Sequence, residues 1–167
     1  IRFFFECNGT RSLMTEAEVL TNLEGIAKKI NQVDPDILML QEADVDSKRV
    51  AFINNVQWLL DHTEMNYAAY ASHWKADYIP SDGIGRVNSG TAILSRFPLS
   101  EATRIALPVK NSTLDGLTAY FHLKRNLLRT KVAVPGEDNF VVVATHTVAF
   151  DNEGSKKTQI DRFVEEL

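Results

Sequence analysis

Two short apolar runs, far apart in the chain, each stop at a pair of polar residues. Residues 37–40 lead into a Gln-Glu pair that ends at Glu42, and residues 140–144 lead into a Thr-His pair that ends at His146. Uninterrupted apolar runs of this length are typical of strands buried on both faces. Open α/β sheets bind their ligands beyond the carboxyl ends of such strands. The sequence therefore predicts an α/β fold that brings Glu42 and His146 to one edge.

A third candidate strand lies near the N-terminus, where the aromatic-rich residues 2–7 precede Asn8. Taken alone, Asn8 could equally be a turn residue. Taken together, three strands that deliver Asn8, Glu42 and His146 to one edge form a constellation suited to chemistry.

The charge of Glu42 suggests what that chemistry needs. A carboxylate at the end of a buried strand is costly to bury unless a cation balances it. A hard divalent metal ion is the usual balance, because it prefers oxygen ligands. Glu42 could instead be a surface carboxylate just past the strand, and the residues alone favour neither reading.

His146 has its own alternative, a hydrogen-bonded histidine at a sheet edge. That structural reading fits the other histidines of the chain better, because none of them ends a buried strand within a motif (His62, His73 and His122). The sequence therefore selects His146 as the candidate site histidine.

Helical spacing and turn signals predict how the strands are connected. Thr15 and Glu18 have the spacing of a capping box and open a helix over 15–32. This helix would link strand 2–7 to the strand that ends at Glu42, so those two strands should pair in parallel.

The rest of the chain predicts further strands, a long loop over 78–87 and two more helices. A helix capped by Asp46-Ser47 would carry Phe52, Ile53, Val56, Leu59 and Leu60. The remaining strands are expected over 67–74, 90–95, 119–134 and 140–144. A closing helix from about residue 155 would present Ile160, Phe163, Val164 and Leu167 on one face.

Composition narrows the class of protein. With 167 residues, 44% of them hydrophobic, the chain is one domain or part of one and can bury a core. Its net charge of −4 does not indicate a nucleic acid partner, although a metal ion can supply positive charge locally for a phosphorylated substrate. The single Cys7 excludes an internal disulfide framework. No apolar run approaches the roughly 20 residues of a membrane span. The compartment stays open, with the cytoplasm favoured, and so does the oligomeric state.

Four segments resemble the endonuclease/exonuclease/phosphatase superfamily, which is deoxyribonuclease I-like. Residues 36–42 are similar to its Asp-Ile-hydrophobic-Gln-Glu motif, and residues 89–98 to its Gly-x-Ala-Ile-Leu-Ser-Arg-x-Pro segment. Residues 143–146 are similar to its Asn-Thr-His-Leu strand, and Asn8 to its strand-terminal Asn. The Gln-Glu and Thr-His motifs are fairly specific when both occur in this order.

Within the superfamily, segments 41–49 and 145–151 resemble a bacterial branch of unassigned substrate. The resemblance implies an α/β (α+β) fold, a four-layer sandwich of two packed mixed β-sheets flanked by helices. The later Gly-Asp-x-Asn and Ser-Asp-His motifs of the superfamily do not occur in the chain. We therefore expect residues 1–167 to form the N-terminal portion of such a domain, with the C-terminal part missing.

The resemblance also implies roles for particular residues. Glu42 would bind a catalytic Mg²⁺, or Mn²⁺, with Asn8 as a further ligand, and His146 would be catalytic. Asn88 would lie near the substrate phosphate. Asp151, which base rates favour as a turn residue, would face the same cleft as His146 and contact the substrate.

The implied reaction is metal-dependent hydrolysis of a phosphodiester or a phosphomonoester. The substrate could be a nucleic acid, a lipid or a small phosphorylated molecule, and the sequence does not choose among them. The alternative is a non-catalytic binding module, or an inactive truncated relative, with the same fold.

Overall fold

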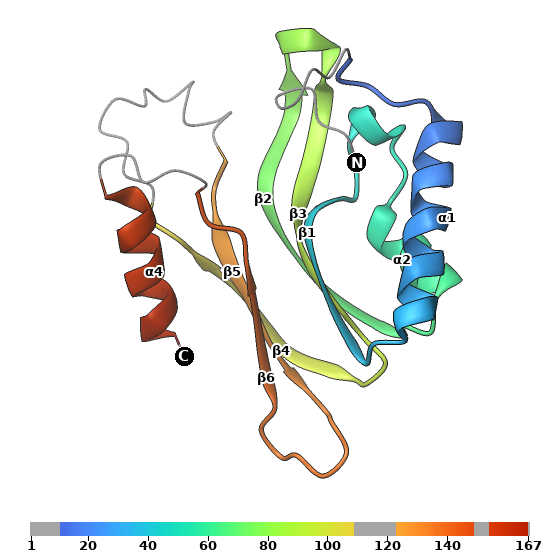
Figure 1. Ribbon diagram of the computed structural model, residues 1–167. Coiled ribbons are helices and arrows are strands. Elements are labelled where there is room, and N and C mark those ends of the chain that lie inside the picture. The colour runs from blue at the N-terminus through green and yellow to red at the C-terminus, as the bar shows by residue number, and fades with distance from the viewer. Residues whose placement is uncertain (1–10, 109–122, 149–153, 167) are drawn as a thin grey trace.

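The computed structural model describes residues 11–108, 123–148 and 154–166. The described strands form two three-stranded antiparallel sheets, and helices lie on the outer side of each. In Figure 1 the layers follow one another as helices, sheet, sheet and helix. The expected four-layer α+β sandwich is therefore confirmed. No helix in the described part of the chain is both long and apolar enough to cross a membrane.

The first sheet contains β1 (Ile37–Asp44), β2 (Tyr67–Ile79) and β3 (Gly85–Ser95), in the order β1-β3-β2. β2 and β3 form a long hairpin around the short turn Ser81–Gly83. Gly90 of β3 lies against β2, and a Cβ there would collide with the carbonyl oxygen of Ala71. Only glycine permits this close approach of the two strands.

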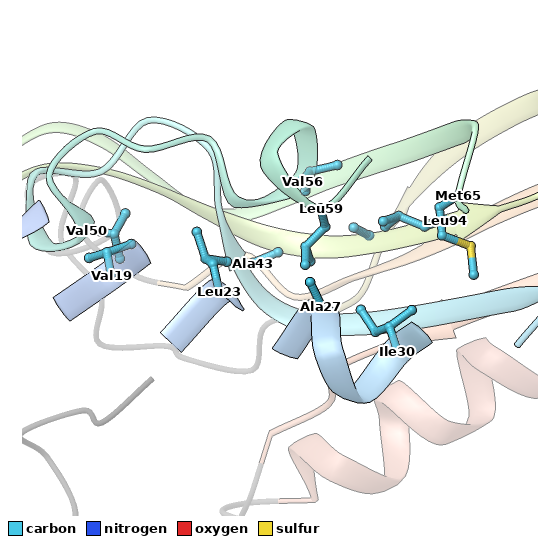
Figure 2. Close-up of a cluster of buried hydrophobic side chains, with 11 residues drawn as sticks. Val19, Leu23, Ala27, Ile30, Ala43, Val50, Val56, Leu59, Met65 and Leu94 are labelled. Atoms are coloured by element: carbon cyan, nitrogen blue, oxygen red, sulfur yellow. The ribbon is translucent and has the colours of Figure 1, made fainter. Parts of the chain in front are cut away.

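Two helices cover the outer face of the first sheet, α1 (Glu16–Val33) and α2 (Asn55–His62). Thr15 caps α1 in the expected capping box with Glu18. One stripe of α1 packs against the sheet and α2 in a buried apolar cluster. Figure 2 shows the labelled members of that cluster: Val19, Leu23, Ala27, Ile30, Ala43, Val50, Val56, Leu59, Met65 and Leu94.

The second sheet contains β4 (Leu99–Ala106), β5 (Asn126–Val132) and β6 (Val141–Thr145), in the order β4-β5-β6. The helix α4 (Ser155–Glu165) lies outside it in Figure 1. The two sheets meet through a second apolar cluster, formed by Ala69, Ala71, Ile93, Leu128, Val132, Val142 and Ala144. The cluster packs β2 and β3 of the first sheet against β5 and β6 of the second.

Several predicted elements differ from the observed ones. The expected loop over 78–87 is shorter, because β2 extends to Ile79 and β3 begins at Gly85. The second helix is not capped by Asp46-Ser47, since Ala51 and Phe52 adopt left-handed backbone and interrupt it. Asn54 caps the helix instead, by accepting a hydrogen bond from the Gln57 backbone.

Two predicted apolar faces are exposed. Met39 in the middle of β1 is 56% exposed, so the expectation that this run is buried on both faces is wrong. In α4, Ile160 and Val164 are exposed and Gln159 is buried. The buried Gln159 side chain accepts a hydrogen bond from the Val148 N–H and donates one to the Pro108 carbonyl.

Strand pairing is antiparallel throughout the described residues. The expected parallel partner, strand 2–7, lies outside the described residues, so the mixed character of the first sheet stays a prediction. Strand 119–134 is confirmed only as β5.

Candidate functional site

Glu42 sits in a bulge near the end of β1. The pairing of β1 with β3 shifts register between Leu40 and Ala43, and Glu42 has a left-handed backbone with φ of 56°. Left-handed backbone is unusual for a residue with a side chain, and such conformations cluster at functional sites. The Glu42 side chain is 37% exposed, so its carboxylate remains accessible to a ligand.

The bulge brings Glu42 to His146. His146 directly follows β6, and its Nδ1 lies 3.8 Å from the Glu42 Oε1. This distance is too long for a hydrogen bond but short enough for direct electrostatic contact. Beside it, the Gln41 Nε2 donates a 2.8 Å hydrogen bond to the Thr145 carbonyl and ties β1 to β6. The Gln-Glu and Thr-His pairs thus meet across the two sheets, as the sequence predicts.

Arg125 adds a positive charge that sequence reasoning missed. Burial lowers the pKa of Arg125, and the nearby Glu42 carboxylate opposes that shift. Its Nη1 is buried and has no hydrogen-bond partner among the described residues. A desolvated guanidinium with an open donor is a suitable partner for an anion. The only sequence signal was the expected strand break near Arg125.

The charge of His146 follows from these neighbours. Burial lowers its pKa, the Arg125 cation lowers it further, and Glu42 raises it. The net shift is downward, so the imidazole is neutral near pH 7. A neutral imidazole carries one N–H donor and one acceptor nitrogen.

The segment that carries Arg125 is clamped to β2. The Lys124 N–H donates to the His73 carbonyl at 2.6 Å. Arg104 of β4 donates from Nε to the Ser72 carbonyl and from Nη2 to the Lys124 carbonyl, each at 3.1 Å. Asn126 also donates to the Ser72 carbonyl, at 3.0 Å. These bonds join the two sheets next to the site.

His73 corrects the sequence reading of the histidines. It was expected to be a hydrogen-bonded histidine at a sheet edge. β2 is an edge strand of the described first sheet, but His73 is 3% exposed and its ring Nδ1 has no hydrogen-bond partner among the described residues. Its ring makes a T-shaped contact with His146, with centroids 5.6 Å apart. The sequence offered no signal, because His73 lies inside a long strand rather than at its end.

Of the other predicted site residues, Asn88 is the one in the described part of the chain. The Asn88 Oδ1 accepts hydrogen bonds from the Tyr70 hydroxyl at 3.2 Å and from the Ser72 hydroxyl at 2.8 Å. Its expected substrate contact therefore stays a prediction. Asn8 and Asp151 lie outside the described residues.

A buried ion pair fixes the chain just beyond Glu42. Asp44 is fully buried and pairs with Arg49, whose Nη2 lies 3.0 Å from its Oδ2. The Ser47 hydroxyl donates to Asp44 at 2.6 Å and accepts from the Asn88 N–H at 2.8 Å. Burial raises the pKa of Asp44, while Arg49 and the Ser47 hydrogen bond hold it down. The network anchors the end of β1 to β3.

Removing Asp44 should therefore destabilise the protein strongly. In Asp44→Ala the buried Arg49 guanidinium loses its counter-ion, which costs about 3–5 kcal/mol of unfolding free energy. Urea unfolding of the full-length protein measures this loss. The control is Asp46→Ala, because the Asp46–Arg86 pair is half-exposed and should contribute less than about 1 kcal/mol. Equal losses in both variants would contradict the anchoring role.

The described residues are compatible with a Mg²⁺ ion that is held by only a few protein side chains. Among the described residues no three His, Cys, Asp or Glu side chains gather as a metal site. Mg²⁺ is commonly held by one or two carboxylates, water and substrate phosphate. Glu42 offers one accessible carboxylate of that kind.

The comparisons with known proteins identify the family and the fold. The model of the Endonuclease/Exonuclease/phosphatase family matches residues 18–154. No curated protein matches the chain.

Solved structures share the fold. An endonuclease/exonuclease/phosphatase from Beutenbergia cavernae DSM 12333 is 21% identical, with a TM-score of 0.71 over 87% of this chain and 38% of its own. A family protein from Leptotrichia buccalis C-1013-b is 13% identical, with a TM-score of 0.61 over 90% of this chain and 57% of its own. The human Nocturnin catalytic domain with bound sulfate is 18% identical, with a TM-score of 0.54 over 93% of this chain and 56% of its own. The chain therefore spans between about a third and three fifths of these structures.

Proposed function

Because this chain belongs to the Endonuclease/Exonuclease/phosphatase family, we propose that it is part of a Mg²⁺-dependent phosphoesterase whose site contains Glu42, His146 and Arg125. Nucleases and phosphatases both cleave phosphate esters, so membership of the family supports this general reaction. The observation that carries the proposal is the meeting of a carboxylate, a neutral imidazole and a desolvated guanidinium at one end of the two sheets.

Glu42 is the proposed metal ligand, and Asn8 is the proposed second one. A bound Mg²⁺ or Mn²⁺ supplies positive charge that polarises the phosphoryl group and stabilises the charge that develops on it. The bulge at Glu42 supports this role, because it turns the carboxylate towards His146.

His146 and Arg125 are the proposed contacts to the phosphoryl oxygens. The neutral imidazole can donate its N–H to one oxygen as charge builds up there, and the guanidinium can donate a charged hydrogen bond to another. Water attacks phosphorus, the bond to the leaving oxygen breaks, and that oxygen takes a proton. Asn88 and Asp151 are proposed to contact the rest of the substrate.

A tetrahedral anion is the shared element of every candidate substrate. The nocturnin structure of the same fold contains bound sulfate, and sulfate has the shape of phosphate. This likeness supports an anion site in the fold but leaves nucleic acid, lipid and small phosphorylated substrates as equal candidates.

A hydrolysis panel on the full-length protein tests the proposal. Phosphodiester and phosphomonoester substrates should be cleaved with Mg²⁺ and not after chelation. If no substrate of any class is cleaved with Mg²⁺ or Mn²⁺, the phosphoesterase proposal fails and the non-catalytic binding module is favoured.

Arg125→Gln should weaken substrate binding. A charged hydrogen bond contributes about 1.5–3 kcal/mol, so KM and the inhibition constant of inorganic phosphate should each rise on the order of tenfold or more. Arg162→Gln is the matched control, because Arg162 pairs with Glu165 on the exposed side of α4. Unchanged phosphate inhibition in Arg125→Gln would remove Arg125 from the substrate site.

A further inference from the structure

The structure places a second histidine beside His146, with its position fixed from two sides. His73 lies where the pairing of β2 with β3 shifts between Ser72 and Trp74. Its carbonyl accepts a hydrogen bond from the N–H of Lys124, which lies just before β5 of the second sheet. Its ring meets the His146 ring edge to face, at an interplanar angle of 79°. Both the backbone and the ring of His73 are therefore held against the site.

Cations surround this ring and keep it uncharged. Burial, together with the nearby charges of Arg125, Arg49 and Arg104, lowers the pKa of His73 to about 3. A protonated ring here would repel Arg125, which is the group proposed to receive the substrate anion. A neutral aromatic ring can fill the space and make the edge contact without that repulsion.

We propose that His73 is a positioning residue of the same site: its neutral ring fixes the plane of the His146 imidazole and thereby aims the N–H of His146 at the reacting phosphoryl group. The contact restricts rotation of the His146 ring. The Nδ1 of His146 has no hydrogen-bond partner among the described residues that could do so instead. Side chains in active sites are usually oriented by such a bond, and here the ring of His73 takes its place. The effect of His73 on catalysis rests on the proposed function. The contact between the two rings does not.

The test compares two variants of His73 in the full-length protein. His73→Ala removes the ring, so kcat should fall roughly 10- to 100-fold through misplacement of His146, with KM within about twofold of wild type. His73→Phe retains a neutral ring and should restore most of kcat. In ¹⁵N spectra, the ring resonances of His146 should form one sharp set in wild type and in His73→Phe, and should broaden or split in His73→Ala.

A matched control separates positioning from loss of stability. Leu128→Ala opens a cavity in the same apolar cluster between the sheets, so it should lower the melting temperature but leave kcat nearly unchanged below that temperature. An equal loss of kcat in Leu128→Ala would overturn the proposal, as would wild-type kcat and His146 resonances in His73→Ala. A His73→Phe enzyme as impaired as His73→Ala would also overturn it. If wild type hydrolyses nothing, the proposed function fails, and the His146 spectra alone decide whether His73 positions the ring.

Discussion

The Glu42→Gln variant of the full-length protein is expected to lose Mg²⁺-dependent hydrolysis by on the order of 10³-fold or more. A metal ion contributes several kcal/mol of transition-state charge stabilisation, and each 1.36 kcal/mol is a factor of ten in rate. Gln has the shape of Glu but lacks the anionic oxygens that a hard divalent cation needs. Among the described residues Glu42 is the accessible carboxylate nearest to His146, so its loss should remove most of the metal affinity.

The same substitution should leave the fold intact. Without metal, the melting temperature should change little, because the variant relieves a partly buried carboxylate but also removes the charge that favours the buried Arg125 cation. Glu24→Gln on the exposed surface of α1 is the matched control and should keep full activity. A Glu42→Gln enzyme as active as wild type would refute the metal role, and a large fall in its melting temperature would indicate a structural one.

His146→Ala is expected to have the second largest effect, a loss of about 10²- to 10³-fold in kcat. That is the range lost when one donor to a developing oxyanion is removed. KM should change little, because the hydrogen bond strengthens as charge develops on the phosphoryl oxygens. Steady-state kinetics at saturating Mg²⁺ measure both constants.

His62→Ala serves as the control for this prediction. His62 lies on α2, stacked on Trp58 in the outer layer, so its removal should leave kcat unchanged. If KM rises and kcat is unchanged in His146→Ala, His146 binds the substrate and the transition state equally and does not act in the chemical step.

The site residues that the sequence predicts are those that lie at the ends of strands. The Gln-Glu and Thr-His pairs follow apolar runs, and the sheets bring Glu42 and His146 together as expected. The bulge that aims Glu42 had no signal, because the register of β1 is set by its pairing with β3 rather than by local residues. The proposed metal and catalytic roles of these residues stay predictions.

The parts that the sequence missed depend on packing between the sheets. Burial lowers the pKa of both Arg125 and His73, and the Arg125 charge lowers that of His73 further. Burial cannot be read from an isolated polar residue. The strand β4 was also missed, since it is largely exposed and its polar sequence shows no clear alternation. The helix α2 was placed too early, because the left-handed backbone at Ala51 and Phe52 has no glycine to signal it.

Direct binding of Mg²⁺ is the most direct test of the central claim that Glu42 holds a catalytic metal ion. Thermal unfolding of the full-length wild type, without substrate, should shift upward as the Mg²⁺ concentration rises, because a ligand that binds only the folded state stabilises it. The shift should be nearly absent in Glu42→Gln and unchanged in Glu24→Gln. A wild type that shows no shift, or a Glu42→Gln variant that shifts as much as wild type, would contradict the account.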